Sequence, residues 1–94
     1  MDLKDLRDEI DKIDDELVKL FVRRMETAAQ IAAYKKEHPQ PNLVPAREQE
    51  KLEDVAQKAG PAMARYTKTL YTLLFELSRS HQSRLTDTAN EDIQ

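Results

Sequence analysis

Apolar residues recur along the first third of the chain with the spacing of a helix face. Six leucines and isoleucines follow one another at steps of three and four residues: Leu3, Leu6, Ile10, Ile13, Leu17 and Leu20. This is the period of an amphipathic helix. Pro39 ends the pattern, because a proline disfavours helical backbone at the residue before it, His38. With no glycine or proline between them, residues 2–37 are predicted to form one helix.

The predicted helix is longer than a compact domain of 94 residues is wide. At 1.5 Å per residue it measures about 54 Å. A compact domain of this size has a diameter of about 32 Å. The apolar face therefore extends beyond what one chain can cover, and we expect a second copy of the chain to pack against it.

A second helix is predicted over residues 46–58. Pro45 stands at its first position, where the missing N–H does no harm, so that Val44 becomes the N-cap. Valine is a poor N-cap because its side chain offers no acceptor, although Asn42 could cap from slightly further back. Gly60, the only glycine of the chain, fits a left-handed C-terminal cap.

A third helix is predicted from Pro61 to about Leu85. Its buried face comprises six large apolar residues: Met63, Tyr66, Leu70, Leu73, Leu74 and Leu77. Beside this face runs a second stripe that begins aromatic and ends polar: Tyr71, Phe75, Ser78 and Gln82. Residues 86–94 are polar, and we expect a disordered tail or the start of a linker there. The chain is therefore predicted to be all-α, with one helical domain over residues 1–85 and a tail over residues 86–94.

Two cations interrupt the apolar face of the first helix. At about 100° per residue, Arg24 and Lys35 fall near the middle of this face, with Ile31 between them. A charge directed into a core is costly without an anion, so both cations need an anionic partner. Each residue taken alone has another explanation. Arg24 could equally be an arginine whose stem packs against apolar surface while its head pairs with an acid. Lys35 could be a solvated residue near the end of the helix. Their shared face favours an anion-binding site.

Four further polar residues lie on or beside apolar faces. Glu48 falls within the face of the second helix, where an acid in the first turn also stabilises the helix dipole. Ser78 and Gln82 belong to the third helix, where a fraying end would also lose hydrophobicity. Arg7 lies at the edge of the first helix's apolar face, and geometry alone favours an ion pair with a nearby aspartate.

Composition narrows the function classes. Charged residues make up 35% of the chain, and the net charge is −3, which argues against a nucleic-acid surface and leaves anion binding to a local cluster of cations. With no cysteine, disulfides and thiolate metal ligands are excluded and a reducing, cytoplasmic compartment is favoured. No stretch is apolar enough to span a membrane, and the first residues are not a signal peptide. His81 has no partner at metal-ligand spacing, so we expect no metal.

The order and spacing of five short segments resemble the all-helical, type II class of chorismate mutase. The segments are Leu6-Arg7-Asp8-Glu9-Ile10-Asp11-Lys12-Ile13-Asp14, Arg23-Arg24-Met25, Lys35, Arg47-Glu48 and Ser78-Arg79-Ser80-His81-Gln82. The likeness covers residues 3–85 and is closest to mutase domains at the N-terminus of bifunctional enzymes that also carry prephenate dehydratase. It implies three helices per chain, an intertwined homodimer in which each first helix crosses both subunits, and two equivalent sites that need neither cofactor nor metal.

Position by position, the resemblance implies a site that binds chorismate and rearranges it to prephenate. Arg7 would be lent to the site of the other subunit. Arg24 would bind a substrate carboxylate, and Ser78 would lie at the rim near a carboxylate. Lys35 and Gln82 would face the ether oxygen of the substrate and act as the catalytic pair.

Glu48 and Val44 bear on the alternatives. The resemblance implies that Glu48 faces the ring hydroxyl, whereas Val44 stands where the family usually has an Asp that caps the second helix and reaches that hydroxyl. An isochorismate pyruvate lyase is built on the same fold with much the same cations but lacks an acid at the position of Glu48, which favours the mutase. The alternative from another class is a helical dimerisation or docking module whose polar stripe residues pair only internally.

Overall fold

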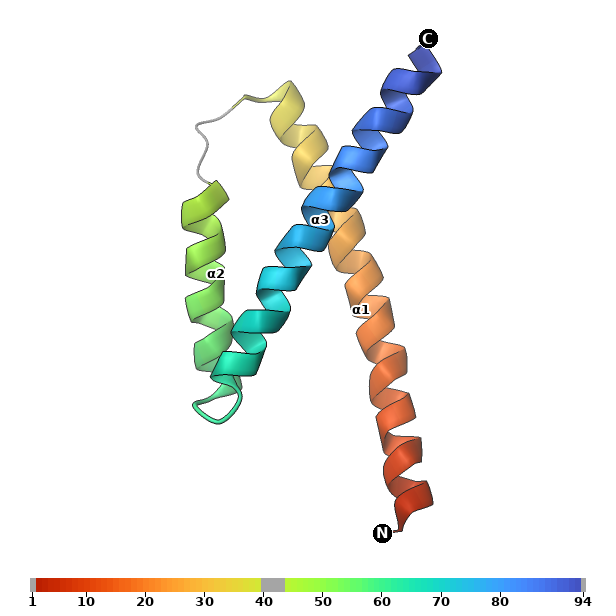
Figure 1. The fold of residues 1–94 in the computed structure, drawn as a ribbon, viewed down its shortest axis with the longest axis vertical. Helices are drawn as coiled ribbons and strands as arrows, with labels where there is room; N and C mark the ends of the chain where they lie inside the picture. Colours follow the sequence, from red (N-terminus) through yellow and green to blue (C-terminus); the bar gives the residue numbers. More distant parts are fainter. Residues whose placement is uncertain (1, 40–43, 94) are drawn as a thin grey trace.

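The computed structural model describes the backbone of residues 2–39 and 44–93, and the side chains of these residues as far as Leu85. In this part of the chain the secondary structure comprises three helices and no strand: α1 (Leu3–Glu37), α2 (Val44–Ala59) and α3 (Ala64–Ile93) (Figure 1). The prediction of an all-α chain with a long first helix is confirmed.

Polar contacts close both ends of α1. At its start the Asp2 carboxylate accepts a hydrogen bond from the Asp5 N–H at 2.9 Å, and the Asp5 carboxylate accepts one from the Asp2 N–H at 3.4 Å. This capping box pairs two N–H groups that have no partner inside the helix. At its end the His38 N–H donates to the Tyr34 carbonyl at 2.9 Å, immediately before Pro39. The predicted bounds of this helix are correct to within one residue.

The start of α2 differs from the prediction. Val44 is the first residue of the helix rather than its N-cap, and Pro45 occupies the second position. Proline is compatible with this place because the first four N–H groups of a helix have no internal acceptor. The suggested cap at Asn42 lies outside the described residues. At the other end Gly60 has φ +84°, and its N–H donates to the Ala56 carbonyl at 3.2 Å, so the predicted left-handed cap is confirmed.

Both ends of α3 were misplaced by the sequence analysis. The helix begins at Ala64, not at Pro61, because residues 61–63 form a turn in which the Met63 N–H donates to the Gly60 carbonyl at 3.1 Å. It continues to Ile93 instead of ending near Leu85, since no proline or glycine interrupts the residues that follow. The role of residues 86–94 as a tail or linker stays a prediction.

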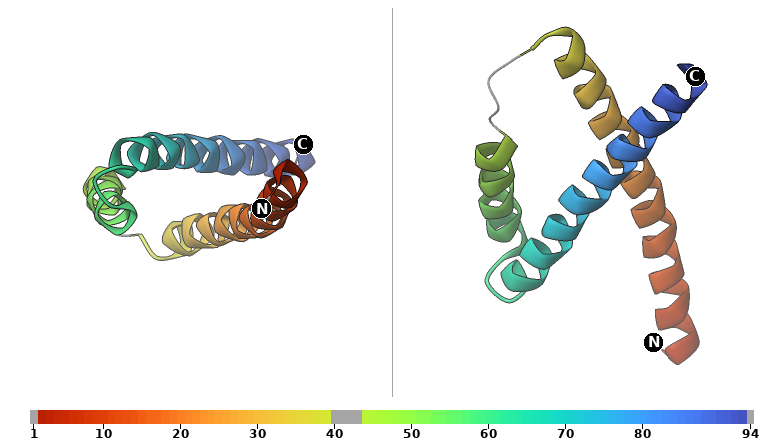
Figure 2. Two further views of the ribbon diagram at one scale, coloured as in Figure 1. Left: turned by 90° about the horizontal axis from the view of Figure 1, so that it is seen from below. Right: turned by 45° about the horizontal axis from the view of Figure 1, so that its top comes forward.

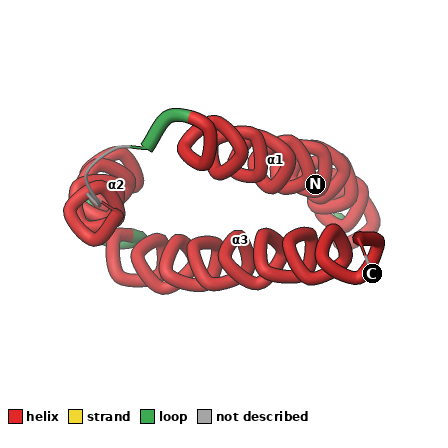
Figure 3. Tube along the Cα trace, turned by 90° about the horizontal axis from the view of Figure 1, so that it is seen from above, coloured by secondary structure: helices red, strands yellow, loops and turns green. Residues whose placement is uncertain are grey.

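The three helices form an open arrangement. α1 and α3 cross, and α2 lies beside the first half of α3 (Figure 1). Viewed along the long axis, α1 and α3 form two opposite sides and α2 closes one end (Figure 2, Figure 3). α3 contacts both other helices, while the Cα atoms of α1 and α2 stay more than 8 Å apart. α3 is therefore the element that holds the chain together.

A single chain buries little apolar surface. Among the described residues, Val55 is the only hydrophobic residue that is buried. The six leucines and isoleucines of the α1 stripe are 49–61% exposed. The predicted buried face of α3 is wrong for one chain, because five of its members are exposed: Met63, Tyr66, Leu70, Leu73 and Leu77. The radius of gyration is 17.2 Å, compared with about 12 Å for a compact domain of this length.

No helix in the described part of the chain combines the length and the hydrophobicity needed to cross a lipid bilayer.

Candidate functional site

A cavity of about 600 Å³ lies between the three helices. α1 lines it with residues between Leu20 and Lys35, α2 with residues between Val44 and Lys51, and α3 with residues between Phe75 and Gln82. Five of the six site residues named from the sequence line this one cavity: Arg24, Lys35, Glu48, Ser78 and Gln82. The faces of the three helices on which the sequence analysis placed these residues therefore meet at this cavity.

The cavity is strongly cationic although the chain as a whole is acidic, with a net charge of −3. In the described part of the chain, six basic side chains line it: Arg23, Arg24, Lys35, Arg47, Lys51 and Arg79. Among the described residues, Glu48 is the one acid in the lining. A concave site lined mostly by one sign of charge concentrates ligands of the opposite sign, so this cavity is suited to an anion.

Arg24 is held by aromatic and neutral groups instead of an acid. Its guanidinium carbon lies 5.5 Å from the ring centroid of Tyr71 and 5.6 Å from that of Phe75. Its Nη1 donates to the Ser78 Oγ at 3.4 Å. Among the described residues no carboxylate forms an ion pair with Arg24. The alternative in which the head of Arg24 pairs with an acid of these residues therefore does not hold. Aromatic faces stabilise the charge without cancelling it, which leaves the guanidinium able to bind an anion.

Ser78 lies deeper than the rim position expected for it. It is 7% exposed and sits where α1 and α3 cross. Besides accepting from Arg24, its hydroxyl donates to the Met25 sulfur at 3.7 Å. Because α3 continues well beyond it, the explanation of Ser78 as part of a fraying helix end is wrong. Its hydroxyl orients the head of Arg24 toward the cavity.

Lys35 and Gln82 come from opposite walls of the cavity. Lys35 lies near the end of α1, and Gln82 lies on α3 one turn beyond Ser78. Within the described part of the chain, no acid pairs with Lys35. The cavity thus places an unneutralised ammonium group and a neutral amide where both face the same space. Their roles toward a substrate stay predictions.

Glu48 forms an ion pair with Arg79 that connects α2 to α3. The Arg79 Nη1 lies 2.6 Å from the Glu48 Oε2 and 2.9 Å from its Oε1. The Glu48 side chain is 27% exposed, and that of Arg79 is 55% exposed. Glu48 therefore has a specific partner on another helix, beyond the helix-dipole effect that its position in α2 suggested.

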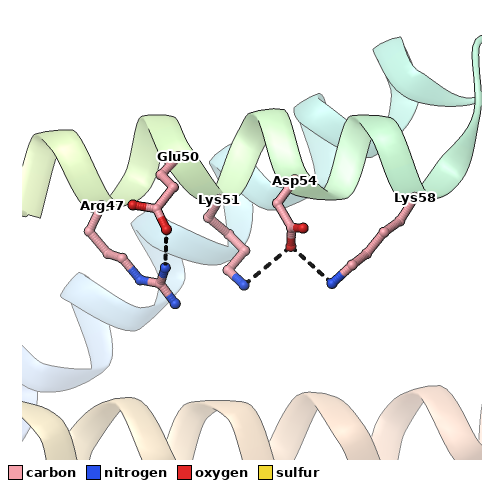
Figure 4. A network of polar contacts seen from close by, with 5 residues as sticks. All are labelled: Arg47, Glu50, Lys51, Asp54 and Lys58. Atoms are coloured by element: carbon pink, nitrogen blue, oxygen red, sulfur yellow. Dashed lines mark hydrogen bonds and ion pairs between the residues drawn. The ribbon is translucent and has the colours of Figure 1, made fainter.

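The basic residues of α2 project toward α1 and are held by acids of their own helix (Figure 4). Arg47 pairs with Glu50 at 2.9 Å, and Asp54 pairs with Lys58 at 3.0 Å and with Lys51 at 3.5 Å. The hydrogen bond from Lys58, together with the positive charges of Lys58 and Lys51, holds the pKa of Asp54 below its ordinary value despite some desolvation.

Sequence reasoning missed four of the cationic lining residues: Arg23, Arg47, Lys51 and Arg79. Lys51 could have been found, because it lies three residues after Glu48 and therefore on the same helix face. Arg23 and Arg47 lie off the apolar faces at about 100° per residue, but a long arginine side chain reaches a cavity from the flank of a helix. Arg79 was part of the family-like segment without a role being assigned to it.

Arg7 does not line the cavity of its own chain. It precedes Arg24 by 17 residues, which places it about 26 Å away along α1. Arg7 is exposed, and no acid among the described residues forms an ion pair with it, so the expected pairing with a nearby aspartate is absent. No group of three or more His, Cys, Asp or Glu side chains in the described part of the chain could hold a metal ion.

Comparison with known proteins relates the chain to one family. A model of the family described as chorismate mutase type II matches residues 6–83. A protein named T-protein from Haemophilus influenzae is 44% identical over 61 residues, which cover 62% of this chain and 16% of that protein. The chain thus spans less than a fifth of the length of this relative. No solved structure matches the chain significantly.

Proposed function

The chain belongs to the type II chorismate mutase family, and on this premise we propose that its cavity binds chorismate and rearranges it to prephenate, a step of aromatic amino-acid biosynthesis. The observation that carries the proposal is the convergence of Arg24, Lys35 and Glu48 with two polar residues of α3 on one cationic cavity. Chorismate carries two carboxylates, and the cavity holds more positive than negative side chains. A dianion of this kind is the ligand that the lining favours.

The reaction asks little of a protein beyond positioning and electrostatics. In the [3,3] rearrangement the ether C–O bond breaks while a C–C bond forms within the same molecule, so no nucleophile has to attack. The protein accelerates it by holding the two reacting ends together in a chair-like conformation. It also stabilises the negative charge that grows on the ether oxygen as the bond breaks.

Lys35 and Gln82 suit the ether oxygen. In the proposed complex the Lys35 ammonium donates a charge-assisted hydrogen bond to that atom, and the Gln82 amide donates a neutral one. Both bonds strengthen as charge develops, so they favour the transition state over the bound substrate. Their placement on opposite walls of the cavity supports this arrangement.

The remaining residues bind and orient the substrate. Arg24 receives a carboxylate, because its planar guanidinium matches the two oxygens and no acid among the described residues pairs with it. Ser78 holds Arg24 in place and adds a hydroxyl near the same carboxylate. Glu48 accepts a hydrogen bond from the ring hydroxyl of the substrate.

We further propose a homodimer in which Arg7 enters the cavity of the partner chain. The support is that Arg7 cannot reach its own cavity and that the apolar stripes of α1 and α3 are exposed in a single chain. Two chains that pack these stripes together would bury them and bring the start of each α1 to the other subunit. We also propose that the protein is located in the cytoplasm and that residues 86–94 begin a linker to a further domain, such as a prephenate dehydratase.

A turnover assay with chorismate tests the function. Loss of chorismate absorbance with formation of prephenate is the expected result, and Arg24→Ala should abolish most of it while the chain stays helical by circular dichroism. Release of pyruvate from isochorismate without prephenate formation would indicate the lyase. If neither compound is turned over, the result would favour the third alternative, a non-catalytic helical dimerisation or docking module.

A further inference from the structure

The Glu48–Arg79 ion pair has a feature that substrate binding by itself does not explain. Of the described residues that line the cavity, Glu48 is the one acid, beside six cations. Lys51 lies three residues along the same helix, within easy reach of an ion pair. Glu48 instead bonds across to α3, while Lys51 pairs with Asp54. Glu48 therefore pairs with one specific cation, Arg79, although several other cations line the same cavity.

The choice matters because the cavity contains cations of two kinds. Arg47, Lys51 and Arg79 each pair with an acid of the chain. In the described part of the chain, Arg24 and Lys35 form no ion pair and are available to an anionic ligand. An acid free to move in the same cavity would pair with them, neutralising the groups that should receive the substrate.

We propose that Arg79 is a positioning residue that holds Glu48 away from the substrate-binding cations. It binds both oxygens of the carboxylate through one nitrogen, which leaves further lone pairs of Glu48 to accept a hydrogen bond from the substrate. Arg79 therefore allows an acid to serve in an anion-binding cavity without competing with the anion. This inference rests on the proposed function and concerns its substrate affinity.

The test is the Michaelis constant for chorismate in a set of variants. Arg79→Ala should raise KM roughly tenfold and change kcat less. A tenfold change in affinity corresponds to the free energy that one hydrogen bond to a charged group typically contributes. Arg79→Lys, which keeps the charge, should restore most of the affinity. Glu48→Gln in the Arg79→Ala background should lower KM again, because the liberated carboxylate is the cause of the defect.

A purely structural tether between α2 and α3 predicts a different result. Removal of either partner then breaks the tether, and the double variant is no better than Arg79→Ala. Arg84→Ala, which removes an exposed arginine of α3 outside the cavity, is the matched control and should leave KM unchanged.

If Arg79→Ala fails to fold, Arg79→Gln carries the same comparison with a side chain of similar length. An unchanged KM in these variants, or a double variant no tighter than the single one, would overturn the inference while the parent still turns over chorismate. Absence of turnover in the parent would instead overturn the proposed function together with the inference. Circular dichroism of each variant separates either outcome from loss of the fold.

Discussion

Arg24 and Arg79 show two ways in which the same side chain is accommodated in one cavity. Arg79 is paired with a carboxylate, whereas Arg24 lies against two aromatic rings and a buried hydroxyl. The other cations of the lining also divide into paired and unpaired ones. Those on α2 are paired with acids of their own helix, and those on α1 form no ion pair among the described residues. α1 therefore supplies the wall that is ready to receive an anion.

Lys35 is the residue of this wall with the most direct predicted role. If its ammonium group donates to the breaking ether oxygen, Lys35→Ala should reduce kcat and kcat/KM together by at least about 10²-fold, the loss typical of one oxyanion donor. Steady-state kinetics with chorismate measure both constants. Lys36→Ala, which alters the neighbouring lysine outside the cavity lining, is the control and should keep the parent's values. A rise in KM alone would contradict the assigned role.

Asp54 gives a prediction that does not depend on activity. The hydrogen bond from Lys58 lowers the pKa of its carboxyl below the ordinary value of 3.8. A pKa depressed by folding means that the contribution to stability is present above the unfolded value and is lost as the pH falls through the folded one. Carbon-detected NMR titration of the aspartate carboxyls should find Asp54 below 3.8, and Lys58→Gln should move its pKa upward. An unchanged midpoint in that variant would refute the contact.

At the scale of elements, Gly60 fixes the turn from α2 into α3. Its φ is +84°, and a Cβ placed on it would meet no atom within 4 Å. The cost of Gly60→Ala should therefore come from the backbone alone, about 1–2 kcal/mol of the free energy of unfolding. Gly60→Asn should cost less, because asparagine tolerates the left-handed region better. Chemical denaturation of the three proteins measures the difference, and equal stability of Gly60→Ala and the parent would contradict it.

The bodies of the helices could be predicted from the sequence, but their ends depended on local chemistry. The three-and-four spacing of apolar residues and the single glycine located α1 and the end of α2. The start of α2 was misplaced because a proline is compatible with more than one position in a first turn. The start of α3 was misplaced because Pro61 belongs to the turn before the helix. The length of α3 was underestimated, since polarity by itself does not stop a helix that contains no glycine or proline.

The candidate site was predictable where a polar residue interrupts an apolar face. Arg24, Lys35 and Glu48 were found in this way, and the structure brings them to one cavity. The partner of Glu48 could not be found, because the contact with Arg79 depends on how closely α2 approaches α3. Helical periodicity describes the faces of one helix and contains no information on the distance between two.

At the scale of the whole molecule, one chain leaves most of its apolar surface exposed. One chain extends over 57 × 30 × 16 Å, and Val55 is its one buried hydrophobic residue in the described part. The apolar stripes of α1 and α3 are exposed over most of their length. A core of this size cannot offset the conformational entropy lost on folding. We therefore expect the chain to fold only as it dimerises, with a melting temperature that rises with protein concentration.

Exchange of Arg7 between the two subunits can be tested by complementation. An Arg7→Ala chain and an Arg24→Ala chain should each form inactive homodimers, because every site then lacks one arginine. In a heterodimer of the two, the site built on the Arg7→Ala chain keeps its own Arg24 and receives Arg7 from its partner. The other site lacks both arginines, so purified heterodimers should recover about half of the parent's activity. Heterodimers as inactive as their parents would show that Arg7 does not act across the interface.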